Sequence, residues 1–169
     1  MTADQKKVAV GAASGIISMS LAMWLLTAVL PHHYAPTAGD RLAYAAGANA
    51  CAAIVLFVMV AAVGNARFLS KAIDPMAHAE SRRMIVDGRV ADNTTQQFLI
   101  FCAATLGLAA NISEDRLHVI AAAAIVFIIA RIAFWIGYRI HPLYRAFGFA
   151  STAYLNLGLL LAAAWLAIR

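Results

Sequence analysis

The chain has 169 residues, of which 63% are hydrophobic and only 12% are charged. This balance excludes an ordinary soluble domain, in which about half of the residues are apolar and about a quarter are charged. The formal net charge is +5, but the basic residues lie between apolar segments and form no patch with interleaved aromatic side chains, so we expect no nucleic-acid partner. The composition indicates a protein that is integral to a membrane and in contact with its lipids.

Five apolar segments are predicted to span the membrane as helices. A helical span needs about 20 apolar residues, and open strands in lipid would leave backbone groups unpaired. The first segment, 8–30, is longer than the roughly 7–15 apolar residues of a cleavable signal peptide, which favours a retained helix. The segment PHHYAPTAGD follows it, with two prolines that stop helical continuation. The other spans are predicted at 42–63, 92–110, 117–138 and 147–168.

Lysine and arginine are distributed unevenly between the two sides of these spans. One side carries Lys6, Lys7, Arg67, Lys71, Arg82, Arg83, Arg89, Arg139 and Arg145. The other side carries Arg41, Arg116 and Arg169. The positive-inside rule therefore predicts a cytoplasmic N-terminus, a cytoplasmic polar stretch at 65–92 and a C-terminus outside.

The third and fourth spans carry polar residues that suggest a binding site. Arg89, Asn93 and Gln96 stand at i, i+4 and i+7, which puts their side chains on one face of a helix. Arg131 lies inside the fourth span, where a charged side chain is costly unless it snorkels or finds a partner. We expect it to pair with the Asn93/Gln96 face or with a bound anion, and snorkelling is the alternative.

Further polar residues continue this pattern toward the cytoplasmic surface. Tyr138 follows Arg131 by seven residues on the same helix face. Arg145 comes another seven residues later, beyond the predicted end of that helix. Arg89, Arg131 and Arg145 are therefore predicted to converge at the inner membrane surface. The acids expected nearby are Glu80, Asp87 and Asp92. The surplus of positive charge suits a small anionic ligand, and attraction to anionic lipid headgroups is the alternative.

The remaining candidate motifs favour packing over chemistry. The small or polar residues of the other spans are expected to join helices to one another; they are Gly11, Gly15, Asn49, Ser151 and Asn156. His32 and His33 have no third ligand at metal-binding spacing, so no metal site is predicted. The chain offers no nucleophile and base of its own at catalytic spacing, so any reaction would use the nucleophile of a bound cofactor.

Three motifs together resemble one known family. NTTQQ at 93–97, ARIAFWIGY at 130–138 and RAFGFASTAY at 145–154 are similar to the MAPEG family, the membrane-associated proteins of eicosanoid and glutathione metabolism, and most of all to its bacterial branch. The likeness covers about residues 42–168. It implies an all-α integral membrane protein of the bacterial inner membrane: a four-helix MAPEG-like domain (42–169) after an extra N-terminal transmembrane helix and outer loop (1–41).

The resemblance also implies a homotrimer that binds glutathione between adjacent protomers near the cytoplasmic surface. The matching glutathione-binding positions in this chain are Arg89, Asn93, Gln96, Arg131 and Tyr138. Arg145 matches the arginine that stabilises the glutathione thiolate and would be the catalytic residue. That role is chemically sound, because a guanidinium beside a thiol favours the ionised form, which is the nucleophile.

Two positions depart from the family pattern. Gln96 stands where the family has an acid, and an amide supplies no countercharge for the ammonium group of glutathione. Phe149 stands where some family enzymes carry a tyrosine. Two functions follow: a membrane-bound glutathione-dependent transferase or peroxidase acting on lipophilic electrophiles, or a non-catalytic lipid-binding protein or accessory subunit of a larger membrane complex.

Overall fold

The computed structural model describes the backbone of all 169 residues and every side chain except that of Pro75. It is built from helices, as predicted. The long helices are α1 (Ala3–Val29), α2 (Ala38–Phe68), α3 (Arg82–Asn111), α4 (His118–Ile140) and α5 (Arg145–Ala167). Two short 3₁₀ helices, η1 (Lys71–Ile73) and η2 (Pro75–Ala77), lie between α2 and α3.

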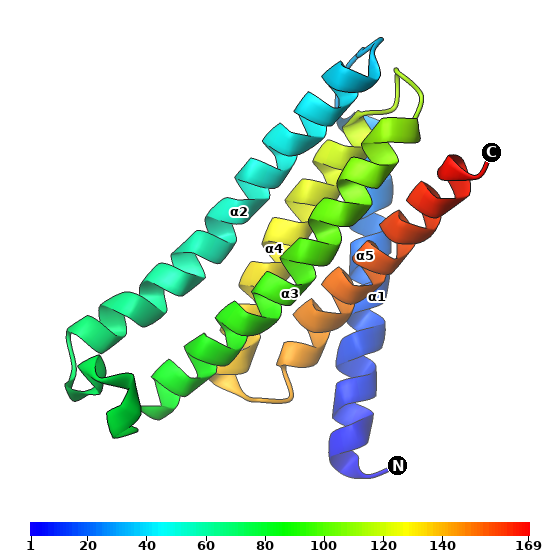
Figure 1. Ribbon diagram of the computed structural model, residues 1–169. Helices are drawn as coiled ribbons and strands as arrows, with labels where there is room; N and C mark the ends of the chain where they lie inside the picture. Colours follow the sequence, from blue (N-terminus) through cyan, green and yellow to red (C-terminus); the bar gives the residue numbers. More distant parts are fainter.

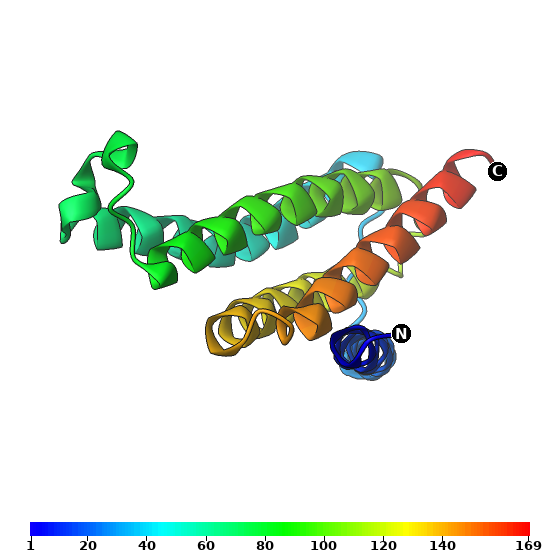
Figure 2. The ribbon, with the colours of Figure 1, turned by 90° about the horizontal axis from the view of Figure 1, so that it is seen from below.

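Consecutive long helices run in opposite directions (Figure 1). The N-terminus, the segment 69–81 and the turn 141–144 therefore lie at one end of the bundle, which we call the basic end because most lysines and arginines are found there. Seen from below, α2 and α3 form one layer, and α4 and the first half of α5 form a second (Figure 2). α1 lies at the outer side of the second layer, next to α5.

The bundle has the length and composition of an integral membrane protein. Among the described helices, α1, α2, α4 and α5 are long and apolar enough to cross a membrane. α3, which we predicted as the third span, does not reach this level of hydropathy because the motif NTTQQ falls within it. Thr94 and Gln97 of this motif are buried against the other helices, so the polar residues of α3 contribute to the interior of the bundle.

Several helices begin before the predicted apolar spans because side chains cap their first turns. Thr2 and Gln5 form a reciprocal capping box at the start of α1, and Thr37 and Asp40 form another at the start of α2. The side chain of Ser81 accepts a hydrogen bond from the backbone N–H of Met84 at the start of α3. These contacts satisfy N–H groups that a helix start leaves free, so the helices extend beyond the apolar spans predicted to begin at residues 8, 42 and 92.

Glycine and buried polar side chains bring the helices into close contact. A Cβ added to Gly148 would overlap the backbone of Phe134, and one added to Gly15 would overlap the backbone of Phe147. Ser151 donates a hydrogen bond to the carbonyl of Gly15 at 3.0 Å, which links α5 to α1. Thr105 of α3 donates to Asn49 of α2 at 2.9 Å. The packing role expected for these small and polar residues is confirmed.

Candidate functional site

A cavity of about 740 Å³ opens at the basic end between α1, α3, α4 and α5. Its polar wall includes Arg89, Asn93, Tyr138 and Arg145. These four residues come from three helices and are all among the site residues predicted from the sequence. The structure therefore brings them together around one space.

Tyr138 and Arg145 are joined directly across the turn between α4 and α5. The Nη1 atom of Arg145 donates a hydrogen bond to the Tyr138 hydroxyl oxygen at 2.8 Å, and the guanidinium lies 4.9 Å from the centre of the tyrosine ring. Arg89 of α3 approaches the same hydroxyl. Because the oxygen of Tyr138 accepts from arginine, its own hydrogen is left to donate to a ligand.

The chain reverses sharply to make this contact. A Cβ on Gly137 would lie 2.8 Å from the carbonyl oxygen of Tyr144, so glycine lets the turn pack closely on the last part of α4. Arg145 is the first residue of α5, immediately after this turn. Tyr138 and Arg145 are therefore brought together by the reversal of the chain between α4 and α5, and not by a shared face of one helix.

Arg131 lies behind the cavity wall and is fully buried. Its guanidinium donates to Asn93 Oδ1 at 2.9 Å, to Thr152 Oγ1 at 2.6 Å and to the carbonyl of Gly148 at 3.1 Å. It also lies 4.3 Å from the centre of the Phe134 ring. Arg131 thus pairs with Asn93, which is one of the alternatives expected for it, and does not snorkel to the surface.

The contact with Arg131 fixes how Asn93 faces the cavity. A guanidinium has donors but no acceptor, so the amide of Asn93 must turn its oxygen toward Arg131. The NH₂ group of Asn93 is then available to a molecule in the cavity. Arg131 itself does not line the cavity, because its side chain has no exposed surface.

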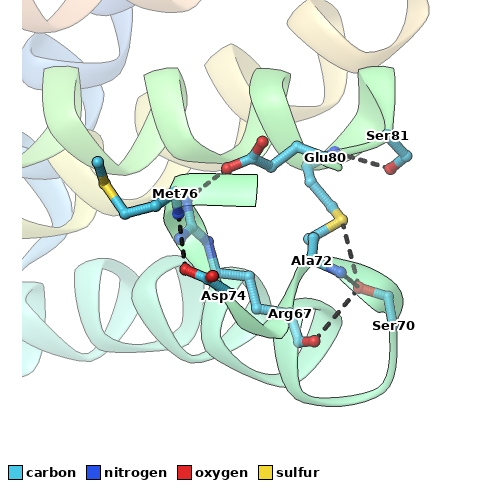
Figure 3. A network of polar contacts seen from close by, with 8 residues as sticks. Arg67, Ser70, Ala72, Asp74, Met76, Glu80 and Ser81 are labelled. Atoms are coloured by element: carbon cyan, nitrogen blue, oxygen red, sulfur yellow. Dashed lines mark hydrogen bonds and ion pairs between the residues drawn. The ribbon is translucent and has the colours of Figure 1, made fainter. Parts of the chain in front are cut away.

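The acids that were expected to neutralise this region form other contacts. Glu80, in the segment between α2 and α3, pairs at 3.1 Å with Arg67 in the last turn of α2 (Figure 3). Asp87 accepts three hydrogen bonds of 2.7 Å, two from Arg139 and one from the Trp135 indole. Asp92 is exposed on α3. Among the described residues, the ion pairs involve none of the three arginines near the cavity, so its positive charge is unbalanced.

Asp87 lies in the first part of α3, before the apolar segment, and its ionisation follows from these contacts. Burial acts to raise the pKa of its carboxyl group. The hydrogen bonds from Arg139 and Trp135, together with the positive charge of Arg139, outweigh this effect and hold the pKa below its ordinary value. The ion pair between Asp87 and Arg139 has no signal in the sequence, because its members lie on different helices.

The rest of the cavity is mainly apolar, although Tyr154 of α5 also lines it. α1 contributes Val8 and Ala12, and α5 contributes Phe149 and Ala150. The two α5 residues follow Arg145 by one turn or more, away from the basic end. The cavity therefore has a cationic part and an apolar part, which suits a molecule or a pair of molecules with both characters. Sequence reasoning did not find the contribution of α1, since α1 lies far from the other lining residues along the chain.

Gln96 is the one predicted site residue that lies away from this region. Its side chain is exposed on α3 and is not part of the cavity wall. Its neighbour Gln97 is buried and accepts hydrogen bonds from Asn156 of α5 at 2.9 and 3.0 Å, so it serves the packing of α3 on α5. The binding and catalytic roles assigned from the sequence stay predictions.

Comparisons with known proteins bear on four of the five long helices, α2 to α5. A sequence model of the MAPEG family matches residues 44–165. The match covers most of α2, all of α3 and α4 and nearly all of α5, and it leaves out α1. Searches of curated proteins and of solved structures return no match.

Proposed function

The chain belongs to the MAPEG family, and we propose that it is a membrane-bound glutathione-dependent transferase or peroxidase that acts on lipophilic electrophiles. The observation that carries this proposal is a cavity whose polar wall offers hydrogen-bond donors and no acid. An anionic ligand would find four donors in this wall: the guanidinium groups of Arg89 and Arg145, the NH₂ of Asn93 and the hydroxyl of Tyr138. Glutathione carries two carboxylates and a thiol that ionises, so its chemistry fits such a wall.

We assign binding and activation to different members of this wall. Arg89 and Asn93 would hold a carboxylate, with Arg131 keeping Asn93 in position. Arg145 and Tyr138 would stabilise the sulfur as a thiolate, with the proton of the thiol released to solvent. In a transfer reaction the thiolate then forms a C–S bond to the electrophilic carbon of the acceptor. Either a leaving group departs from that carbon with its electron pair, or a C=C π bond opens and the resulting carbanion takes a proton from solvent. The apolar part of the cavity, near Phe149, would receive that acceptor from the bilayer.

The family resemblance extends the proposal to assembly and location. We infer a homotrimer in the bacterial inner membrane, with the basic end in the cytoplasm. Gln96 is exposed on α3, so its assigned role in glutathione binding would require a site shared with a neighbouring protomer. There it would supply an amide where the family pattern has an acid, which weakens the hold on the glutathione ammonium.

Titration of the purified full-length protein with glutathione tests the proposal. We expect calorimetry to detect binding at millimolar glutathione, and a general electrophile to be conjugated. Arg145→Ala should abolish conjugation, because the thiolate loses its cation and Tyr138 loses its partner. Arg116→Ala is the matched control, since Arg116 is an exposed arginine at the opposite end of the bundle. Calorimetry that stays flat at millimolar glutathione would remove the enzyme from consideration.

The second candidate is a non-catalytic lipid-binding protein or an accessory subunit of a larger membrane complex. Gln96 and Phe149 favour it, because both lack groups that the family pattern has at those positions. It predicts no conjugation by the wild-type chain. A Gln96→Glu variant that gains glutathione binding would indicate a site that has lost its original ligand.

A further inference from the structure

Two hollows outside the cavity meet on the other side of α4. A basic hollow of about 570 Å³ lies where α3 begins and α4 ends, and its polar lining includes Arg82, Arg83 and Arg139. An apolar hollow of about 640 Å³ lies between α2 and α4 and is lined mainly by isoleucine and valine side chains, with Trp135. Arg139 lines both hollows. The two spaces are therefore adjacent, one cationic and one apolar.

The basic hollow has an excess of positive charge. Asp87 engages the Nε and Nη2 atoms of Arg139, which leaves the Nη1 donors of that guanidinium for another acceptor. Arg82 and Arg83 are exposed, and neither takes part in an ion pair among the described residues. One carboxylate thus faces three guanidinium groups. A phosphate group is the anion that such a cluster binds best, because guanidinium geometry matches its oxygens.

The apolar hollow lies between α2 and α4, which are both apolar enough to cross the membrane. Its side chains are open to the surroundings: Ile54, Val58, Ile132 and Ile136 are 62%, 47%, 42% and 53% exposed. Trp135 stands where the apolar hollow gives way to the arginines, and its indole N–H is held by Asp87. Tryptophan favours this boundary in membranes, because its ring is apolar and its N–H is polar.

We propose that the two hollows together bind one anionic phospholipid. Its phosphate lies among Arg82, Arg83 and Arg139, and an acyl chain lies along the groove between α2 and α4. Charge complementarity favours this occupant, since a phospholipid supplies both a phosphate for the arginines and an acyl chain for the groove, whereas an apolar partner helix would occupy the groove alone. Basic pockets beside transmembrane helices bind anionic headgroups for the same reason. The proposed lipid contacts use none of the residues assigned to glutathione, although Tyr138 lines the basic hollow as well as the cavity.

The test is lipid retention by the full-length protein. The protein is reconstituted in phosphatidylcholine vesicles with a minor fraction of phosphatidylglycerol, extracted in mild detergent and examined by native mass spectrometry. We expect the wild type to retain phosphatidylglycerol in preference to phosphatidylcholine. The double variant Arg82→Gln/Arg83→Gln should retain about tenfold less. Lys6→Gln/Lys7→Gln removes two charges from the same end of the bundle and should leave retention unchanged.

A second variant tests the acyl-chain groove. Ile132→Trp replaces an exposed aliphatic side chain of the groove with a bulkier aromatic one. We expect it to lower phosphatidylglycerol retention although both arginines are intact. Unchanged retention in the arginine double variant overturns the proposal. So does an equal loss in the lysine double variant, which indicates general attraction to the membrane surface. A change in the mass of the assembly in Ile132→Trp, without loss of lipid, identifies the groove as a subunit contact and also overturns it.

Discussion

Arg131 is a buried cation whose hydrogen bonds hold three helices together. From α4 it reaches Asn93 on α3 and both Gly148 and Thr152 on α5. Its Nη1 and Nη2 atoms bond to neutral oxygens rather than to an acid, and its buried Nε–H has no partner among the described residues. The arginine therefore carries its positive charge close to the cavity, while the NH₂ group of Asn93 is left free to face the cavity.

We expect the planar guanidinium group of Arg131, and not its charge alone, to support glutathione binding. Lysine keeps the charge but has a single ammonium group, which cannot reproduce the set of bonds to Asn93, Thr152 and Gly148. Arg131→Lys should free the Asn93 amide and weaken glutathione binding about tenfold, as expected for the loss of one hydrogen bond to a charged group. Calorimetry measures this. Thr105→Val, which removes a buried hydrogen bond between α2 and α3, should leave the affinity unchanged, and equal effects in both variants would contradict the assignment.

Asp87 is the residue we expect to contribute most to stability at the basic end. Its side chain is 4% exposed, and Arg139 holds it with two bonds. Asp87→Asn should lower the free energy of unfolding by about 2 kcal/mol, because charge-assisted hydrogen bonds are lost in a buried setting. Thermal unfolding in detergent measures the effect. Asp4→Asn breaks an ion pair whose side chains are 72% and 63% exposed, and should cost less than about 0.5 kcal/mol.

The pH dependence of this contribution follows from the lowered pKa of Asp87. Below its ordinary value of 3.8, the unfolded chain binds a proton that the folded chain still excludes, so stability falls as the pH drops. Above that value both states are ionised and the contribution is complete. The stability difference between the wild type and Asp87→Asn should therefore be constant near neutral pH and shrink as the pH falls below 3.8. A difference that stays constant into this acid range would contradict the pairing.

At the scale of elements, the contact between α4 and α5 sets the geometry of the site. α5 approaches α4 so closely at Gly148 that its carbonyl accepts a hydrogen bond from Arg131, and no Cβ fits there. The same helix begins with Arg145 and lines the cavity with Phe149. A small shift of α5 would therefore move the cationic and the apolar parts of the cavity together.

Gly148→Ala is the substitution that tests this contact. The added methyl group meets the backbone of Phe134 and of Ala130, neither of which can rotate away, so we expect a loss of about 2 kcal/mol or more in the free energy of unfolding. Gly47→Ala is the control, because a Cβ there meets nothing within 4 Å. It should be neutral or stabilising by up to about 1 kcal/mol, through its higher helix propensity. Thermal unfolding of both variants in one detergent compares them, and equal melting temperatures would refute the close contact.

α1 differs from the other helices in how it joins the bundle. It packs on α5 through Gly11 and Gly15, and it supplies Val8 and Ala12 to the cavity. The family match excludes it. The division of the chain into an N-terminal helix with its loop (1–41) and a four-helix unit (42–169) stays a prediction.

At the scale of the whole molecule, the alternating direction of the helices gathers the basic residues at one end (Figure 1). The positive-inside rule predicts that this end is cytoplasmic. Ala79→Cys and Ser113→Cys place a thiol on exposed segments at opposite ends, in a chain whose Cys51 and Cys102 are replaced by alanine. An impermeant maleimide should label the thiol at position 113 in intact cells, and the one at position 79 only after permeabilisation. The reverse pattern would invert the predicted orientation.

Much of this architecture follows from the sequence alone. The lengths of the apolar runs predict the membrane helices, and the spacing of Arg89, Asn93, Tyr138 and Arg145 predicts a polar cluster at one end. The capping boxes at Thr2 and Thr37 can also be read from the sequence, and they place the helix starts ahead of the apolar spans. All these signals are local, because helix periodicity and capping depend on residues within a few positions of one another.

Only the tertiary structure decides which helix faces meet. It places Arg131 behind Asn93 and not in the cavity, turns Gln96 outward, and joins Asp87 to Arg139. It also brings α1 against α5 to complete the cavity wall. Periodicity assigns a side chain to a face of its own helix, but the neighbour of that face is selected by close backbone approach at residues such as Gly148 and by interhelical hydrogen bonds. These contacts join residues far apart in the chain, so no local pattern encodes them.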